Sequence, residues 1–105
     1  MAGCGPETVC IDHVIDGDTV ILDNRERVRI TGIDAPELEE PSGYVARQEA
    51  QMLLDGRCLE FVPGRSRTTG GRRGHYGRLI GDFRLPDGRL FSEYMIANGH
   101  AVKFK

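Results

Sequence analysis

Apolar and polar residues alternate along the first third of the chain, which is the pattern of β-strands. From Thr8 to Ile15, apolar residues occupy both alternate sets of positions, as expected of a curved strand with both faces covered. A second run spans Thr19–Leu22 and a third spans Glu26–Ile33. Asp16-Gly17 and Asp23-Asn24-Arg25, which separate these runs, are typical of tight turns. The pattern therefore predicts three strands joined by short turns.

The spacing of the apolar residues becomes helical between Gly43 and Asp55. Ser42 is a suitable N-cap for this segment, and Gly56 is a suitable C-terminal stop. One face of the helix would carry four apolar residues: Ala46, Ala50, Leu53 and Leu54. We expect this helix to plug one end of a barrel.

The remainder of the chain returns to strands and ends in a second helix. Cys58–Val62 and Arg78–Leu85 predict a fourth and a fifth strand, separated by a Gly/Arg-rich loop over residues 63–75. After a hairpin-type turn at Pro86-Asp87-Gly88, a short helix begins at Ser92. Five short strands with one helix after the third strand and a short C-terminal helix are the order of an OB-fold barrel, a mainly β fold with α.

The length and charge of the chain narrow this picture. A chain of 105 residues is too short for a second core, so we predict a single domain over residues 1–105 with a flexible lead over residues 1–7. The formal net charge of -2 argues against coating nucleic acid through bulk charge. Arginines without acidic residues nevertheless gather between Gly64 and Arg78. This segment is either a local polyanion contact or a solvated basic loop.

Three cysteines leave the cellular compartment open. Cys10 and Cys58 lie in apolar runs, where buried thiols are expected. Cys4 would pair with Cys10 in an oxidising compartment or stay free in a reducing one. The chain shows no signal-peptide core and no apolar run of transmembrane length, so we expect no membrane partner. The protein would be secreted or periplasmic if a leader has been removed, and cytoplasmic otherwise.

Carboxylates gather at two breaks between the predicted strands. Asp16-Gly17-Asp18-Thr19 forms the first break and Gly32-Ile33-Asp34-Ala35-Pro36-Glu37 the second. If the chain reverses direction once between the two breaks, these carboxylates can lie close together. Hard cations such as calcium prefer such oxygen ligands. Each cluster taken alone has another interpretation, as a hairpin turn or as a loop whose Asp caps a backbone amide.

Two arginines accompany the carboxylates. If Val28 and Ile30 face the core, Arg29 between them points out of the barrel toward a ligand. Arg78 follows in Tyr76-Gly77-Arg78. Carboxylates, a metal ion and two guanidiniums are the parts that a phosphodiesterase needs.

Taken together, these motifs resemble the staphylococcal nuclease family, over a region from about Val9 to Val102. The resemblance implies an OB-fold enzyme that hydrolyses DNA and RNA in a calcium-dependent reaction with little sequence preference, cleaving on the 5′-oxygen side of the phosphate. Four stretches carry it: Val14-Ile15-Asp16-Gly17-Asp18-Thr19-Val20, Arg29 to Glu37, Tyr76-Gly77-Arg78 and Asn98-Gly99-His100-Ala101.

The resemblance also implies a role for each site residue. Asp18 and Asp34 would be carboxylate ligands of Ca²⁺, with the backbone carbonyl of Ala35 as a third protein ligand. Asp16 would add negative charge around the metal, and Thr19 would help through its hydroxyl and a bound water.

The predicted substrate groups complete this set. Glu37 would be the general base, and Arg29 and Arg78 would bind the phosphate oxygens as planar, permanently charged forks. Tyr76 and His75 would contact the substrate. For Tyr76 the alternative is a half-buried barrel aromatic, and for His75 a solvated loop residue.

Some positions depart from the family pattern. Larger members continue beyond the position of Lys105 into a segment with substrate-stacking tyrosines, so we expect a weak base pocket here. A homodimer could cover the same region. We interpret His13 and His100 as structural. The alternative function is a catalytically weak or inactive OB-fold nucleic-acid-binding module, but the complete set of site residues favours the enzyme.

Overall fold

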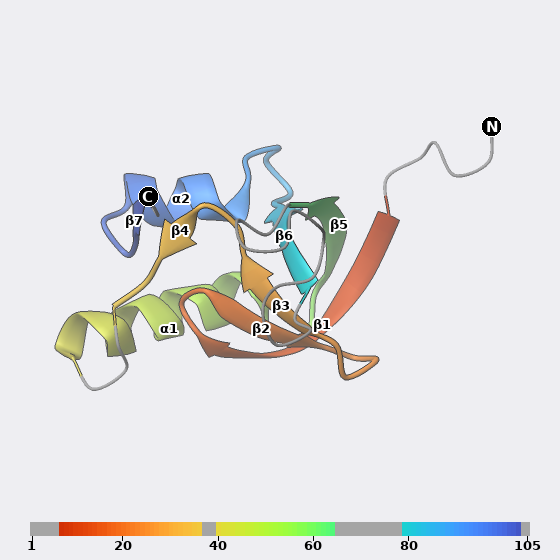
Figure 1. The fold of residues 1–105 in the computed structure, drawn as a ribbon, viewed down its shortest axis with the longest axis horizontal. Coiled ribbons are helices and arrows are strands. Elements are labelled where there is room, and N and C mark those ends of the chain that lie inside the picture. Colours follow the sequence, from red (N-terminus) through yellow and green to blue (C-terminus); the bar gives the residue numbers. More distant parts are fainter. Residues whose placement is uncertain (1–6, 37–39, 65–78, 104–105) are drawn as a thin grey trace.

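The computed structural model describes residues 7–36, 40–64 and 79–103. Within these ranges a five-stranded barrel closes in the order β1-β2-β3-β6-β5 (Figure 1). Its strands are β1 (Glu7–Asp16), β2 (Thr19–Leu22), β3 (Arg27–Ile30), β5 (Cys58–Pro63) and β6 (Leu79–Arg84). Outside the barrel lie a two-stranded sheet of β4 (Ile33–Asp34) and β7 (Val102–Lys103), and the helices α1 (Pro41–Leu54) and α2 (Phe91–Ala97). The predicted barrel with one helix after the third strand and a short C-terminal helix is confirmed.

Strand β1 has 10 residues and pairs with a different neighbour along each half. Its first half runs antiparallel to β5, and its second half runs antiparallel to β2. The β1–β2 register shifts between Ile11 and His13 and again between Val14 and Asp16. Such irregularities bend a strand. A parallel pair between β3 and β6 closes the ring.

The interior of the barrel follows the predicted alternation. Val28 and Ile30 are fully buried, whereas Arg29 between them is only partly buried and lies outside the core. The buried face of α1 consists of Gly43, Ala46, Ala50 and Leu54. Small residues on this face allow the helix to approach the strands closely, and Figure 1 shows α1 and α2 on the same side of the barrel.

The prediction for the third strand, Glu26–Ile33, was wrong in its length. Strand β3 ends at Ile30. Gly32 has a backbone φ of +77°, which residues with a β-carbon rarely adopt. The chain turns there and leaves the barrel as β4. In β4, Asp34 pairs with Val102 of β7 instead of with a barrel strand. This turn separates the second acidic break from the barrel wall.

The helix ends also differ from the predictions in detail. Glu40 is the N-cap of α1, and Pro41 begins the helix in place of the predicted Ser42 cap. Proline suits the first turn because its missing N–H would be unpaired there in any case. Gly56 takes a φ of +71° after the helix, which confirms the predicted stop. Helix α2 begins at Phe91, one residue before the predicted Ser92. Neither helix of the described residues is long and apolar enough to cross a membrane.

The prediction of buried thiols at Cys10 and Cys58 was wrong, because these two residues form a disulfide. They face each other directly in the β1–β5 pair. Residues in directly opposed positions have β-carbons close enough for a sulfur–sulfur bond. This pairing also removes the predicted Cys4–Cys10 alternative, and Cys4 itself lies outside the described residues.

A buried carboxylate anchors α2 to the barrel. Asp82 on β6 is 1% exposed and accepts hydrogen bonds from the backbone N–H of Phe83 (2.8 Å) and of Ser92 (3.1 Å), and from the Ser92 hydroxyl. Burial raises the pKa of Asp82, and these hydrogen bonds oppose the rise. The Tyr94 hydroxyl donates to Glu49 at 2.5 Å, which ties α2 to α1 as well.

Reducing the Cys10–Cys58 disulfide should lower the free energy of unfolding by about 2–4 kcal/mol, because the bond closes a loop across 48 positions and so restricts the unfolded chain. Urea unfolding with and without reductant, followed by circular dichroism, measures the effect. A Cys4→Ser variant is the control and should keep the full response to reductant. Equal midpoints in both conditions would contradict a structural disulfide between β1 and β5.

Candidate active site

The two acidic breaks meet at one edge of the barrel, and Asp18 joins them. Its carboxylate Oδ2 accepts a hydrogen bond from the backbone N–H of Ala35 at 2.9 Å. Its backbone carbonyl accepts one from the N–H of Ile30 at 2.8 Å. The β1–β2 turn, the end of β3 and the segment after β4 are therefore held together through one residue.

Gly17 makes this close approach possible. A β-carbon at this position would lie 2.8 Å from the β-carbon of Ala35 and 3.2 Å from that of Ala46 on α1. A contact of 2.8 Å between carbons is not tolerated without movement of the backbone, so glycine is required. Asp16 supports the same turn by accepting a hydrogen bond from the N–H of Asp18 at 3.1 Å.

The guanidinium of Arg29 lies between two of the predicted metal ligands. Its Nη2 is 3.6 Å from Asp18 Oδ2 and 3.5 Å from Asp34 Oδ1, and its Nη1 donates to the carbonyl of Ile30 at 2.7 Å. The side chain of Asp18 is 12% exposed, whereas that of Asp34 is 58% exposed. One cation thus balances an inner and an outer carboxylate at the surface of the barrel.

Asp16 and Thr19 lie beside this cluster, and their supporting roles stay a prediction. The Thr19 hydroxyl donates to Asp18 Oδ1 at 3.2 Å. Burial raises the pKa of Asp16 from 3.8 to about 6, and its hydrogen bond and charge interaction with Asp18 add to the rise. Asp16 is therefore only half ionised near pH 6 and carries its full negative charge well above that pH.

The oxygen donors of this cluster suit a hard cation in type. Asp18 and Asp34 supply carboxylates, and Ala35 is close enough to Asp18 for its backbone to belong to the same site. Within residues 7–36, 40–64 and 79–103, no three His, Cys, Asp or Glu side chains group closely enough to hold a metal ion. The described part of the site therefore offers two carboxylates. The predicted residues Glu37, Arg78, Tyr76 and His75 lie outside the described residues.

A pocket that the sequence did not indicate opens beside Asp34. Its volume is about 280 Å³, and it is bounded by residues 34–36 and 99–102 and by Glu40. The β4–β7 pairing brings these two segments together. His100, interpreted from the sequence as structural, lines this pocket. A strand pair of two residues leaves no periodic pattern, so sequence reasoning had no signal to find it.

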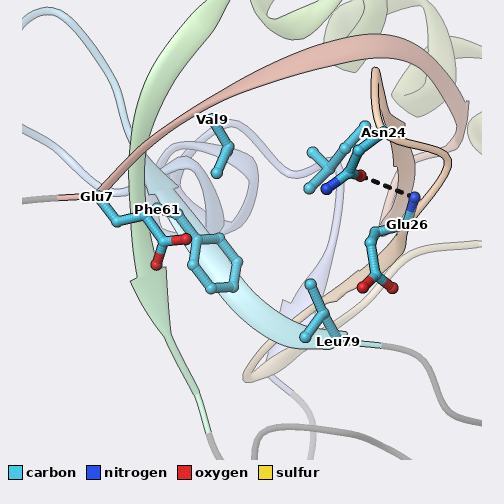
Figure 2. A pocket seen from close by; sticks show the side chains of 7 residues that line it. Glu7, Val9, Asn24, Glu26, Phe61 and Leu79 are labelled. Carbon is cyan, nitrogen blue, oxygen red and sulfur yellow. Dashed lines mark hydrogen bonds between the residues drawn. The ribbon is translucent and has the colours of Figure 1, made fainter.

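A second pocket is lined by residues of β1, β2, β5 and β6 and of the turn after β2. Figure 2 shows its lining side chains, among them Glu7 at the start of β1 and Leu79 at the start of β6. None of Asp16, Asp18, Arg29 and Asp34 is among the residues that line it. This pocket is therefore not part of the candidate active site.

Asp16→Asn should change the pH dependence of stability in a chelator-containing buffer. Because the folded-state pKa of Asp16 is raised, its contribution to stability is fully present below pH 3.8 and is lost as pH rises to about 6. The variant should therefore gain about 1 kcal/mol relative to the wild type between pH 4 and pH 7, a figure reduced for the half-buried position. Urea unfolding at several pH values measures the difference.

The exposed Asp87 provides a control of opposite sign. Hydrogen bonds from the backbone and side chain of Arg89 lower the pKa of Asp87. The ionised Asp87 therefore stabilises the fold at neutral pH, and this contribution is lost as pH falls through the lowered pKa. Asp87→Asn should lose stability relative to the wild type as pH rises. The interpretation of Asp16 would be contradicted if both variants shifted in the same direction.

Comparison with known proteins shows several nucleases of similar sequence. An "Uncharacterized endonuclease" of Escherichia coli is 32% identical over 92 residues, which cover 85% of this chain and 56% of that protein. The "Probable staphylococcal-like nuclease CAN3" of Oryza sativa subsp. japonica is 33% identical over 88 residues, 84% of this chain and 21% of that protein. The "Staphylococcal-like nuclease CAN1" of Arabidopsis thaliana is 31% identical over 81 residues, 77% of this chain and 23% of that protein. The chain thus spans about half the length of the bacterial relative and less than a quarter of the plant ones.

A family model matches a long stretch of the chain in addition to the short motifs. The model described as "Staphylococcal nuclease homologue" covers residues 27–105, which include Arg29, Asp34 and the pairing of β4 with β7. The closed five-stranded barrel agrees with this match. On this evidence the chain belongs to the staphylococcal nuclease family.

Proposed function

We propose that the protein is a calcium-dependent nuclease that hydrolyses DNA and RNA with low sequence specificity. The observation that carries the proposal is the Arg29 guanidinium held between Asp18 and Asp34 at the edge of an OB-type barrel. It combines a phosphate-binding group with two hard oxygen donors in one place. The family and its nuclease relatives support the same general activity.

Arg29 is the residue best placed to bind the substrate phosphate. Hydrolysis of a phosphodiester builds negative charge on the phosphate oxygens, and a fixed cation that meets this charge lowers the barrier. The contact from Arg29 Nη1 to the Ile30 carbonyl orients the guanidinium. Its Nη2 lies 3.6 Å from Asp18 Oδ2 and 3.5 Å from Asp34 Oδ1, so a phosphate oxygen bound here would meet the guanidinium beside both proposed metal ligands.

Asp18, Asp34 and the carbonyl of Ala35 are the groups that would hold calcium. The bound ion would neutralise phosphate charge and polarise the attacked bond. Asp18 is pre-positioned for this role, since Ala35 and Thr19 both donate hydrogen bonds to its carboxylate. In this proposal Glu37 removes a proton from the attacking water and Arg78 provides the second contact to the phosphate. Tyr76 and His75 remain predicted substrate contacts.

An oxidising location fits the same proposal. The Cys10–Cys58 disulfide is the type of cross-link that persists in secreted or periplasmic proteins and is reduced in most cytosolic ones. We therefore place the nuclease outside the reducing cytosol. Labelling of free thiols in protein taken directly from its host would report the redox state of the pair.

The alternative is a nucleic-acid-binding OB module with little or no catalysis. The observation that favours it is the lack of a three-ligand group in the described part of the chain. Two carboxylates alone give a weak calcium site, because protein calcium sites commonly use six to eight oxygens. The first test below separates the two functions.

Digestion of single-stranded DNA and of RNA should require calcium and should stop with chelator. Glu37→Gln should reduce the rate by about 10²-fold or more, because it removes the proposed general base and keeps the shape of the side chain. Gel analysis of labelled substrates measures both effects. Glu60→Gln on β5 is a matched control that should leave the rate unchanged. Binding of nucleic acid without any cleavage would favour the binding module.

Arg29→Gln should separate metal binding from catalysis. Removing the cation beside Asp18 and Asp34 relieves its competition with calcium, so the calcium Kd should fall about fivefold, equivalent to about 1 kcal/mol at this surface position. The cleavage rate should nevertheless fall about 10²-fold, because the phosphate contact is lost. Calorimetric titration with calcium and a cleavage assay measure the two effects.

Arg27→Gln is the control for this experiment. It removes the same charge from an exposed position on the same strand, outside the carboxylate cluster. At physiological ionic strength its effect on calcium affinity should be small because of screening. Equal gains in affinity in both variants would show a general charge effect and would contradict a direct contact of Arg29 with the metal ligands.

A further inference from the structure

The pocket beside Asp34 adjoins the group proposed to bind the substrate phosphate. It begins at Asp34, whose Oδ1 is 3.5 Å from Arg29 Nη2. A polynucleotide whose phosphate rests on Arg29 must continue past this point in both directions. The pocket is thus a recess within reach of one of the flanking nucleosides. This inference rests on the proposed function, and it adds the part of the substrate that lies beside the phosphate.

The β4–β7 pair and the turn after α2 form two walls of this pocket. The β4–β7 pair sets Asp34 opposite Val102. After α2, Gly99 takes a φ of +76° and His100 donates its backbone N–H to the carbonyl of Met95 at 2.8 Å. Ala101 is buried in the core. The turn that presents His100 is thus fixed at both ends, as a binding wall requires.

The lining of the pocket suits an uncharged planar ligand. Ala35, Pro36, Ala101 and Val102 provide apolar surface, and Val102 is 66% exposed. His100 supplies the aromatic ring among the lining residues, and bases stack on such rings in single-strand recognition. A volume of about 280 Å³ is at the low end for small-molecule sites and fits one nucleoside better than a run of bases.

The negative charge of the pocket favours the base of a nucleotide over its phosphate. Asp34 and Glu40 place two carboxylates on its wall. These groups repel a second phosphate and accept hydrogen bonds from amino groups. Adenine, cytosine and guanine carry exocyclic amino groups that thymine and uracil lack. The pocket chemistry therefore favours an amino-bearing base.

We propose that this pocket is a nucleoside subsite next to the scissile phosphate, in which the base stacks on His100 and donates its amino group to Glu40.

A binding experiment tests the subsite without any need for catalysis. Adenosine is titrated into ¹⁵N-labelled protein and the backbone amide shifts are followed, with ribose 5-phosphate as a probe that lacks a base. Adenosine should shift the amides of residues 99–102, and ribose 5-phosphate should not. His100→Ala should weaken adenosine binding by about 5-fold to 100-fold, the range for loss of one stacking partner.

Three further variants make the result specific. His100→Phe keeps a ring and should restore binding to a level near that of the wild type. His13→Ala removes an exposed histidine on β1 and should bind adenosine as the wild type does. Glu40→Gln should reduce the preference for adenosine over thymidine. Shifts outside the pocket, or equal binding by His100→Ala and wild type, would overturn the proposal.

Kinetics then connect the subsite to the reaction. The ratio of kcat/KM for an oligonucleotide to that for bis(p-nitrophenyl) phosphate, which has no nucleoside, should fall about 10-fold in His100→Ala and stay constant in His13→Ala. If kcat/KM for both substrates fell by the same factor in His100→Ala, His100 would act on folding or on the reaction itself, and this result would overturn the subsite. If the wild type cleaves neither substrate, the proposed function fails, and the adenosine titration alone decides on the pocket.

Discussion

The hydrogen bonds of Asp18 are the constraint on which the candidate site depends. Its carbonyl binds the end of β3, and its carboxylate binds the segment that follows β4. The first contact continues the β2–β3 pairing, and the second adds the segment after β4, which no barrel strand holds there. They also explain why the turn before Asp18 contains Gly17, since any side chain there would collide with Ala35. Buried polar groups must be paired, so a nearly buried carboxylate with fixed donors sets the positions of its neighbours.

The departure of the chain from the barrel at Gly32 places the chemistry at a junction. A longer third strand would have kept Asp34 on the barrel wall. The turn instead carries Asp34 onto the small β4–β7 sheet, where it faces Arg29 from outside. The same step creates the pocket between β4 and the end of α2. Phosphate binding, metal binding and nucleoside binding are thereby proposed for adjacent surfaces of one junction.

Charge balance connects these surfaces. The Nη2 of Arg29 lies 3.6 Å from Asp18 Oδ2 and 3.5 Å from Asp34 Oδ1. In the proposed function, a metal ion would bind the two carboxylates while the guanidinium contacts a phosphate oxygen. Asp16, whose pKa is raised to about 6, keeps the total negative charge of the cluster lower at mildly acidic pH. The site is therefore stable enough to fold and polar enough to bind ions.

Much of the architecture was determined by the sequence alone, because it depends on local periodicity. The alternation around Val28 and Ile30 placed Arg29 outside the core, and the helical spacing of Ala46 and Ala50 defined the buried face of α1. The sequence also marked Asp18 and Asp34 as candidate site residues, and the structure brings both close to Arg29. Such features need information only from neighbours in the chain.

Contacts between distant segments were decided only by the tertiary structure. The Cys10–Cys58 bond depends on the register of β1 against β5, and an apolar run does not specify register. The β4–β7 pair contains two residues on each side, too few for a periodic signal. The pocket at His100 exists only because that pair forms. Local sequence pattern thus determined the strands, the helices and the candidate site residues, and long-range pairing decided what surrounds those residues.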